Sequence, residues 1–565
     1  MRSGLWRLLR ATLLLGALLA TLGHASGRWP LRLITELDLI IADARLRALM
    51  PRTLDPRIVI VDVDEKSLAE VGQWPWPRDC LAALSDELFE HQHAAVVGFD
   101  VLFAEPDTSG SAKGLIDELA AEVPALAPRL AALRARLDHD GQFARALAGR
   151  RAVLGFYLTS DRGGRQTGVL PAPVFDAAVL QGRRIAFMQW DGHAASLEAL
   201  ARAAPAAGFF NFAPDADGQV RSVPLIAEHG GRHYEALALA MFRSFAGNPA
   251  VVPILPAGTG RDYDALGGIA LQQGTDRLLI PVDSRVRSRV PFRGAGGPQG
   301  GSFEYVSASD ALGGRVAPGH LAGKIVLVGP TAPGLYDQRS TPVAAVYPGV
   351  EVHASLLSGL LEGRLPVQPD WAGVVEVAQL LFIAAVAGLA IPRLRGARAA
   401  QLTLALVAAL VVLNLWSYRA HAVALPLASA LLLAGALYVG ITVWAYIVEG
   451  RTRHSLARLF GTYVPPELVA EMARDPTTRF DMRAENRELT VMFCDMRNFT
   501  SVSELLAPED VRALVNRFFS SMTLAIRDHR GTLDKYIGDA IMAFWGAPLG
   551  DPAHAACPRS AWASA

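Results

Sequence analysis

Two aspartates near the end of the sequence, Asp495 and Asp539, stand where a divalent-metal site can form. Asp495 follows an apolar run, Leu489–Phe493, that predicts a β-strand. Asp539 belongs to a Gly-Asp dipeptide between two short apolar runs, and this pattern predicts a hairpin with a two-residue turn. The hairpin can bring Asp539 beside Asp495. Because Mg²⁺ prefers a few carboxylate oxygens together with substrate phosphates, we expect a two-magnesium site here.

The segment after Asp495 is suited to hold a phosphate. We expect a tight loop, whose backbone N–H groups face the phosphate, over Met496, Arg497, Asn498, Phe499 and Thr500. Asn498 suits a left-handed position in this loop, because asparagine tolerates that conformation better than most residues. Apolar residues at helical spacing then predict an amphipathic helix over Pro508–Arg530.

The segments FCDMRNFT and KYIGDAIMAFWGAP resemble the two metal-aspartate motifs of the class III nucleotidyl cyclases. The resemblance implies an α+β, ferredoxin-like domain in which Asp495 and Asp539 bind two Mg²⁺ or Mn²⁺ ions. It implies that Lys535 contacts adenine, which favours ATP over GTP as the substrate. The reaction of the family is attack of the ribose 3′-hydroxyl on the α-phosphate, which yields 3′,5′-cyclic AMP and pyrophosphate. Taken singly, these residues could equally be a strand-end cap, a turn residue and a solvated lysine.

The resemblance also implies an active site shared between two cyclase domains, in which one partner supplies an asparagine and an arginine that stabilise the transition state. We assign no residue of this sequence to those two roles, and residues 487–565 are shorter than a typical domain. We therefore expect an incomplete cyclase domain, through truncation or a shifted reading frame, with little activity by itself. The alternative is a non-catalytic transmembrane sensor that signals through a partner chain.

Composition and hydropathy indicate a membrane protein. The net charge is zero, which does not favour nucleic acid as a partner, and the mean hydropathy is +0.26. Four apolar stretches suit membrane spans: Leu5–Gly23, Trp371–Ile391, Ala399–Trp416 and Ala422–Val448. Arginines cluster before the first, between the second and third, and after the fourth, so the positive-inside rule places these segments in the cytoplasm. The first stretch is either an uncleaved anchor or a signal peptide.

The region between the first two stretches predicts an outer α/β domain. β-Branched apolar runs predict strands at Arg57–Asp64, Ala94–Phe103 and Lys324–Gly329, and helical patterns cover Leu115–Leu147 and Tyr234–Phe245. Strands that alternate with helices favour a largely parallel sheet covered on both faces. Five carboxylates near strand ends could converge on a cation, but we expect carboxylates in such positions to be loop caps and solvated groups before metal ligands: Asp62, Asp64, Asp100, Glu105 and Asp107.

Several phrases of this region resemble the second type of CHASE domain, an extracellular sensory module of bacterial receptors. They include IVIVDVDEKSLAEVGQWPWPRD, VGFDVLFAEPD and GKIVLVGPTAPGLYDQRSTPV, in the order of the family. The resemblance implies a sensor role for an unidentified extracellular stimulus, with three membrane spans to follow.

The sequence thus predicts a multi-domain, multi-pass protein of the inner (plasma) membrane, in contact with lipid and acting as a homodimer or with a partner cyclase chain. Its parts are an N-terminal anchor (1–26), an extracellular sensor domain (27–368), three transmembrane helices (369–448), a cytoplasmic linker helix (449–486) and the cyclase domain (487–565). Its cysteines, Cys80, Cys494 and Cys557, are too far apart in sequence to indicate a disulfide framework or a zinc site.

Overall fold

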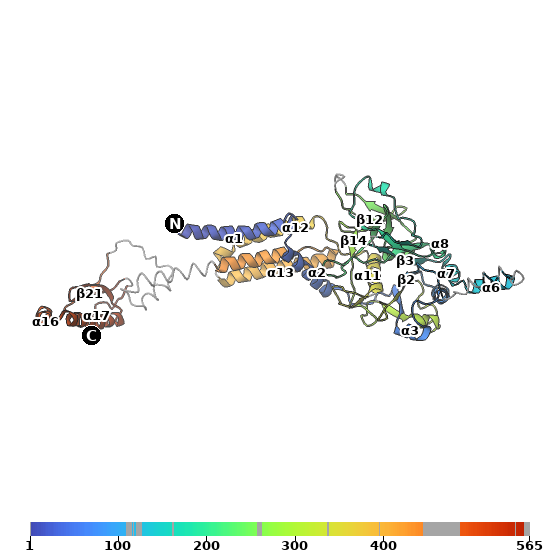
Figure 1. The fold of residues 1–565 in the computed structure, drawn as a ribbon. Coiled ribbons are helices and arrows are strands. Elements are labelled where there is room, and N and C mark those ends of the chain that lie inside the picture. The colour runs from blue at the N-terminus through green and yellow to red at the C-terminus, as the bar shows by residue number, and fades with distance from the viewer. Residues whose placement is uncertain are drawn as a thin grey trace. The chain divides into compact units, whose positions relative to one another are not determined.

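The computed structural model describes residues 2–108, 127–160, 163–256, 263–335, 338–394, 396–443, 486–547 and 550–556, with single positions at 116, 118, 119, 122 and 558 (Figure 1). It has two compact units. The larger comprises Leu15–Ala390 and Ala397–Gly435, and the smaller comprises Met1–Leu14, Ile391–Gly396 and Ala436–Ala565. The predicted linker helix (449–486) falls outside the described residues except for its last position. The two units are described separately below.

An eight-stranded sheet forms the centre of the larger unit. In spatial order its strands are β15 (Glu304–Ser307), β1 (Ile58–Val63), β16 (Ile325–Pro330), β2 (Val96–Leu102), β3 (Ala152–Thr159), β6 (Gly192–Ala194) and β4 (Gln166–Thr167), and β7 (Ala206–Phe209) also pairs with β3. Every pairing is parallel except that of β3 with β6. The prediction of a largely parallel sheet is therefore confirmed.

Helices cover both faces of this sheet, as predicted. Along β1, Ile58 and Ile60 point into one core, whereas Val59 and Val61 point into the other. The first core is closed by α9 (Leu237–Phe245) and α11 (Gly349–Glu362). The second is closed by α4 (Arg78–Asp86), α7 (His139–Leu147), α8 (Glu198–Ala203) and α10 (Ala308–Leu312). Strands buried on both faces account for the continuous apolar runs in the sequence.

Two predicted helices begin or end differently from the expectation. The helix expected at Tyr234–Phe245 begins at Leu237, because Tyr234 lies in β10 (Arg232–Glu235) and pairs with Ala227. The helix expected at Leu115–Leu147 is divided, in its described part, into α6 (Ala127–Arg136) and α7.

Gly98 lets helix α9 approach the sheet closely. A Cβ atom at Gly98 would lie 2.2 Å from the sulfur of Met241, inside any allowed contact. A larger residue at this position of β2 would push α9 away from the strand, so glycine here serves the packing of helix on sheet.

Smaller elements surround the main sheet. The remaining strands are β5 (Met188–Trp190), β8 (Ser222–Pro224), β9 (Ile226–His229), β11 (Ala250–Ile254), β12 (Gly268–Gln273), β13 (Asp276–Ile280), β14 (Arg287–Arg289), β17 (Gln338–Arg339) and β18 (Tyr347–Pro348). They form the small sheets β10-β9-β5, β11-β12-β13, β14-β8 and β17-β18.

The carboxylates at the end of β1 act as caps, as expected. Asp62 accepts hydrogen bonds from the backbone N–H and the hydroxyl of Thr331. Asp64 precedes α3 (Glu65–Val71) and accepts from the N–H of Ser67 at 2.8 Å. Both carboxylates therefore satisfy nearby donors within the fold.

Among the residues that the structure describes, two helices are long and apolar enough to cross a membrane: α12 (Ala372–Leu389), and α13 (Gly396–His421) over Ala397–His421. The described apolar segments of the other two predicted spans, Thr12–Ala25 of α1 (Arg2–Ala25) and Ala428–Val443, are shorter. The fourth predicted span was expected from Ala422, but its helix begins only at Ala428. Pro426 has no backbone N–H to donate to a preceding carbonyl, which favours a helix start near it and not before it. Of the four predicted spans, two therefore have a described helix that is long enough to cross a membrane.

Helix α2 (Arg32–Leu49) links the sheet domain to the apolar helices. On one side, Asp43 receives two hydrogen bonds from Arg221, at 2.9 and 2.8 Å. On the other side, Asp38 accepts from the N–H groups of Leu427 and Ala428, at the start of the last apolar helix. These hydrogen bonds attach α2 to the sheet domain on one side and to the last apolar helix on the other.

Candidate functional site

The smaller unit contains a three-stranded antiparallel sheet in the order β19-β21-β20. Its elements are β19 (Thr490–Cys494), α16 (Phe499–Leu505), α17 (Pro508–Asp528), β20 (Thr532–Ile537) and β21 (Ala540–Trp545). Met522 and Ile526 of α17 pack on Leu533, Ile541 and Trp545 of the sheet. The predicted strand, amphipathic helix and hairpin are confirmed.

Strand pairing brings the two aspartates to the same end of the sheet. Cys494, the last residue of β19, pairs with Ile541 near the start of β21. Asp495 follows the first of these residues, and Asp539 stands two positions before the second, in the turn that Gly538 opens with φ +70°. The antiparallel register therefore requires Asp495 and Asp539 to be neighbours.

The electrostatics of Asp495 reflect this neighbour. Its pKa is raised, first by a hydrogen bond to Asp539, then by partial loss of water, and then by repulsion from the charge of Asp539. Two ionised carboxylates that lie side by side repel each other, and a cation between them removes that repulsion. The donor set fits a hard divalent ion, which takes oxygen ligands from a few carboxylates and from a substrate.

Within the described residues, no group of three or more His, Cys, Asp or Glu side chains could hold a metal ion. A metal at Asp495 and Asp539 would therefore need further ligands from water or from substrate phosphates, which is common for Mg²⁺. Cys494 points into the core and is buried, and its pKa is raised by burial first, so it is not suited to be a ligand.

The loop after Asp495 is shorter than predicted. Met496, Arg497 and Asn498 form it, whereas Phe499 and Thr500 are already the first residues of helix α16. Asn498 has φ +60° and ψ +26°, which is the left-handed conformation predicted for it. This residue turns the chain from the strand into the helix, so the helix begins two residues earlier than a loop over 496–500 would allow.

Lys535 lies on the opposite edge strand from Asp495. It pairs with Met542 across β20 and β21, next to a register shift between Leu533 and Lys535. Its ammonium lies 3.2 Å from the carboxylate of Asp534, and within the described residues it forms no ion pair with Asp495 or Asp539. The fold thus brings the two aspartates together and leaves the lysine apart from them.

One face of this sheet exposes apolar side chains, which the sequence motifs did not predict. Val491 and Phe493 are 46% and 65% exposed, on the face opposite to helix α17, and Ile537 is also half exposed. The signal was present in the sequence, because a strand that is apolar at successive positions is usually covered on both faces. An open apolar face of this kind is a candidate contact surface.

Comparison with known protein families decides the identity of the larger unit. The family model described as the CHASE2 domain matches residues 12–390. This chain belongs to the CHASE2 domain family. A second model, described as the adenylate and guanylate cyclase catalytic domain, matches residues 482–560 of the CHASE2 protein, which include both aspartates and Lys535.

Two of the curated relatives are adenylate cyclases. Adenylate cyclase 1 of Rhizobium meliloti is 38% identical over 97 residues, which is 17% of this chain and 14% of the relative. An adenylate cyclase of Anabaena cylindrica is 36% identical over 87 residues, 15% of this chain and 17% of the relative. The CHASE2 protein thus spans less than a fifth of the length of these relatives.

A solved bacterial light-regulated adenylyl cyclase also matches, with 26% identity and a TM-score of 0.13, over 18% of this chain and 29% of that one. The two family models alone show that the chain combines a CHASE2 domain with a region that is similar to adenylate and guanylate cyclase catalytic domains.

Proposed function

We propose that this CHASE2 protein is a membrane sensor whose outer domain controls an adenylate cyclase domain in the cytoplasm. The observation that carries the proposal is the meeting of Asp495 and Asp539 at one end of the small sheet, inside the segment that matches the cyclase family. Two neighbouring carboxylates repel each other when both are ionised, and a divalent cation bound between them offsets that repulsion. A metal-dependent reaction on a nucleotide would use such a cation.

Asp495 and Asp539 would hold two Mg²⁺ or Mn²⁺ ions. Bound there, these ions would lower the pKa of the ribose 3′-hydroxyl and offset the charge of the triphosphate. The 3′-oxygen then forms a bond to the α-phosphorus of ATP, the bond from that phosphorus to the bridging oxygen breaks, and pyrophosphate leaves. The 3′-hydroxyl proton passes to solvent, and the products are 3′,5′-cyclic AMP and pyrophosphate.

The loop Met496–Asn498, with Phe499 and Thr500 at the start of α16, would contact the phosphates of ATP through backbone N–H groups. Lys535 would donate to adenine in the opposite site, since its ammonium lies beside Asp534 and not beside Asp495 and Asp539. This separation supports a site shared by two chains. The exposed apolar face with Val491 and Phe493 is a suitable surface for such pairing, as a homodimer or with a partner cyclase chain.

We assign no residue of this sequence to the asparagine and arginine that stabilise the transition state in the cyclase family. We therefore propose that the metal-binding half of the site lies in these residues and that a partner domain supplies the other half. Since loss of preorganised charge stabilisation commonly costs about 10²–10³-fold in rate, two copies of this chain alone should make little cyclic AMP. Without a partner, the protein would act as a non-catalytic sensor.

The proposed topology has four membrane crossings: α1, α12, α13 and the helix Ala428–Val443. The length and hydropathy of α12 and α13 support two of them. Trp371 and Trp416 are 51% and 58% exposed and lie near the ends of α12 and α13, where aromatic rings anchor helices at the lipid interface. The sensor domain (27–368) would face the outside and the cyclase domain (487–565) the cytoplasm.

Cysteine labelling tests this topology. In a chain with the native cysteines replaced by serine, Thr275→Cys in the β12–β13 turn and Glu509→Cys in α17 both present an exposed thiol. A membrane-impermeant maleimide added to intact cells should label the first and leave the second unlabelled until the cells are opened. Labelling of both in intact cells, or of neither, would contradict the topology.

Cyclic AMP formation from Mn-ATP tests the catalytic proposal. Membranes that contain the chain alone should make little cyclic AMP, and this amount is compared with that from membranes that contain the Asp495→Ala variant. Strong activity that disappears with Asp495→Ala would support the metal assignment and contradict the need for a partner. Strong activity that survives Asp495→Ala would contradict the metal assignment itself.

A further inference from the structure

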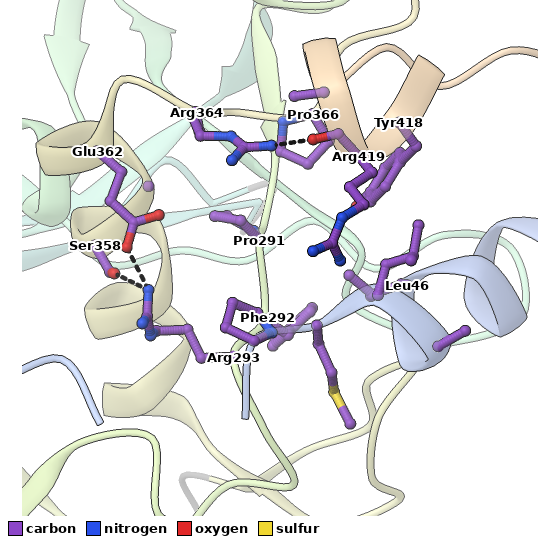
Figure 2. A pocket seen from close by; sticks show the side chains of 16 residues that line it. Leu46, Pro291, Phe292, Arg293, Ser358, Glu362, Arg364, Pro366, Tyr418 and Arg419 are labelled. Atoms are coloured by element: carbon purple, nitrogen blue, oxygen red, sulfur yellow. Dashed lines mark hydrogen bonds and ion pairs between the residues drawn. The ribbon is translucent and has the colours of Figure 1, made fainter. Parts of the chain in front are cut away.

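A cavity of about 460 Å³ lies in the larger unit where helix α2, the sheet domain and the outer end of α13 meet (Figure 2). Leu46 of α2 forms one wall. Phe292 and Arg293, with Ser358 and Glu362 of α11, form the second, and Tyr418 and Arg419 of α13 form the third. The volume is in the range of small-molecule sites, which are concave and combine apolar walls with a few polar groups. The cavity therefore has room for a small ligand that touches three parts of the unit together.

The charges around the cavity are unbalanced. Arg293 is neutralised, because its guanidinium pairs with Glu362 and donates to the hydroxyl of Ser358 (Figure 2). Arg364 donates to the backbone carbonyl of Arg419. Among the residues that the structure describes, no carboxylate lies within ion-pair distance of the guanidinium of Arg364 or Arg419. Two cations without counter-ions at one cavity leave a net positive charge that an anion can neutralise.

The position of Arg419 is unusual for its surroundings. Figure 2 shows its side chain reaching from the end of α13 toward Leu46 and the backbone of Phe292. Arg419 lies in the last turn of α13, and residues 422–427, which join α13 to the next apolar helix, contain no lysine or arginine. The proposed topology places this end of α13 outside. Because translocated loops usually carry few basic residues, an arginine here that also faces a cavity favours a binding role.

The walls add an apolar component to the recognition. Leu46, Pro291 and Phe292 supply apolar surface beside the two guanidiniums. Arginine forks bind phosphate and carboxylate oxygens in two-point geometry, and apolar walls accept a short hydrocarbon part. We propose that this cavity binds an amphiphilic anion, a phosphate or carboxylate group that carries a short apolar chain, through Arg364 and Arg419. The same chemistry occurs in a soluble organic anion and in the headgroup region of an anionic lipid.

The cavity lies where a bound ligand can change the contacts of the apolar helices. Helix α2, which forms one wall, is held to the sheet domain by Asp43 and Arg221 and to α13 by Arg45 and Asn414. A ligand between α2, α11 and α13 changes the contacts of all three at once. The proposal that the ligand of this cavity is the stimulus rests on the proposed sensor function. The binding of the ligand does not rest on it, because binding is measured without any cyclase assay.

Calorimetric titration of the full chain in nanodiscs tests the binding. The chain is placed in phosphatidylcholine discs and titrated with hexyl phosphate, and with inorganic phosphate for comparison. The test variant is Arg364→Gln with Arg419→Gln. The matched control is Arg28→Gln with Arg32→Gln, which removes the same charge from exposed residues before and at the start of α2 that do not line the cavity. A second set of discs with added phosphatidylglycerol distinguishes the two sources of the anion.

Hexyl phosphate should bind to the parent chain and to the control variant, more tightly than inorganic phosphate does, and about tenfold or more weaker to the test variant. Loss of hexyl phosphate binding in phosphatidylglycerol discs would mean that the lipid occupies the cavity, and would identify lipid as the source of the anion. Unchanged binding in these discs would identify a soluble anion as the ligand. Absence of binding to the parent chain, or an equal loss in the control variant, would overturn the proposal. If the double variant does not fold, Arg419→Gln alone, at an exposed helix end, gives the same comparison.

Discussion

The guanidinium of Arg45 donates a hydrogen bond of 2.7 Å to the side-chain oxygen of Asn414. These residues are 369 positions apart in sequence, and their contact joins helix α2 to the apolar helix α13. Arg45 also lies 4.8 Å from the ring centre of Tyr418, and its pKa is lowered to about 10, chiefly by burial. Because no carboxylate pairs with Arg45 in the described part of the chain, the hydrogen bond to Asn414 is a main compensation for its buried charge.

Removal of Asn414 should therefore be more damaging than removal of Arg45. We expect Asn414→Leu to destabilise the larger unit by about 2–4 kcal/mol, because it leaves a buried guanidinium with fewer acceptors. Arg45→Met should cost less, and Arg45→Met with Asn414→Leu should be more stable than Asn414→Leu alone. Denaturant unfolding in detergent measures this double-mutant cycle. Additive effects of the two substitutions would show that the contact contributes nothing.

The stability of the larger unit should fall in acid because of His353. This side chain is fully buried on α11, stacked on Phe212 at 4.8 Å, and its pKa is lowered to about 3, first by burial, against a raising effect of the Phe210 carbonyl. The unfolded chain binds the proton near pH 6.5, whereas the folded chain does not until near pH 3. This contribution to stability is therefore full above pH 6.5 and is lost as the pH falls toward 3, by about 1.4 kcal/mol per unit.

Replacement of His353 by leucine removes this titration and keeps the volume similar. Between pH 6.5 and 4.5 the parent chain should lose more stability than His353→Leu, and the difference between the two curves isolates the histidine from other titrating groups. Unfolding monitored by near-ultraviolet circular dichroism at several pH values provides the measurement. Parallel curves for the two proteins would mean that the folded state accepts a proton on His353.

Metal binding should depend on both proposed ligands in the smaller unit. Asp495→Asn and Asp539→Asn should each weaken Mn²⁺ binding, measured with ATP present by electron paramagnetic resonance, by about tenfold or more. Asp534→Asn is the matched control, because this aspartate lies on the same hairpin but pairs with Lys535. Equal losses in all three variants would indicate a general effect of charge and would refute the assignment.

Much of the candidate site could be predicted from local sequence. A Gly-Asp pair between apolar runs can form few structures other than a hairpin, and asparagine at position 498 indicated the left-handed turn that is found there. The start of helix α16 at Phe499 was missed, because a single left-handed residue is enough to begin the helix and the motif alone does not reveal this.

Long-range relationships could not be predicted in the same way. The apolar runs predicted β1, β2 and β16, but nothing in them indicates that β16, from far later in the chain, lies between the other two. The contact of Arg45 with Asn414 and the cavity at Arg419 depend on that packing as well. Arg45 and Asn414 are unremarkable in their own sequence neighbourhoods, and only the fold brings the residues of the contact and of the cavity together.

The proposed cyclase function is tested most directly by complementation. Membranes that contain this chain are mixed with a cyclase domain of the family whose own two metal-binding aspartates are replaced by alanine, and co-purification confirms that the two chains associate. The account predicts cyclic AMP from Mn-ATP with the parent chain and with Asp534→Ala, and a loss of about 10²-fold or more with Asp495→Ala. No cyclic AMP from the associated parent pair, or the same amount with Asp495→Ala, would contradict it.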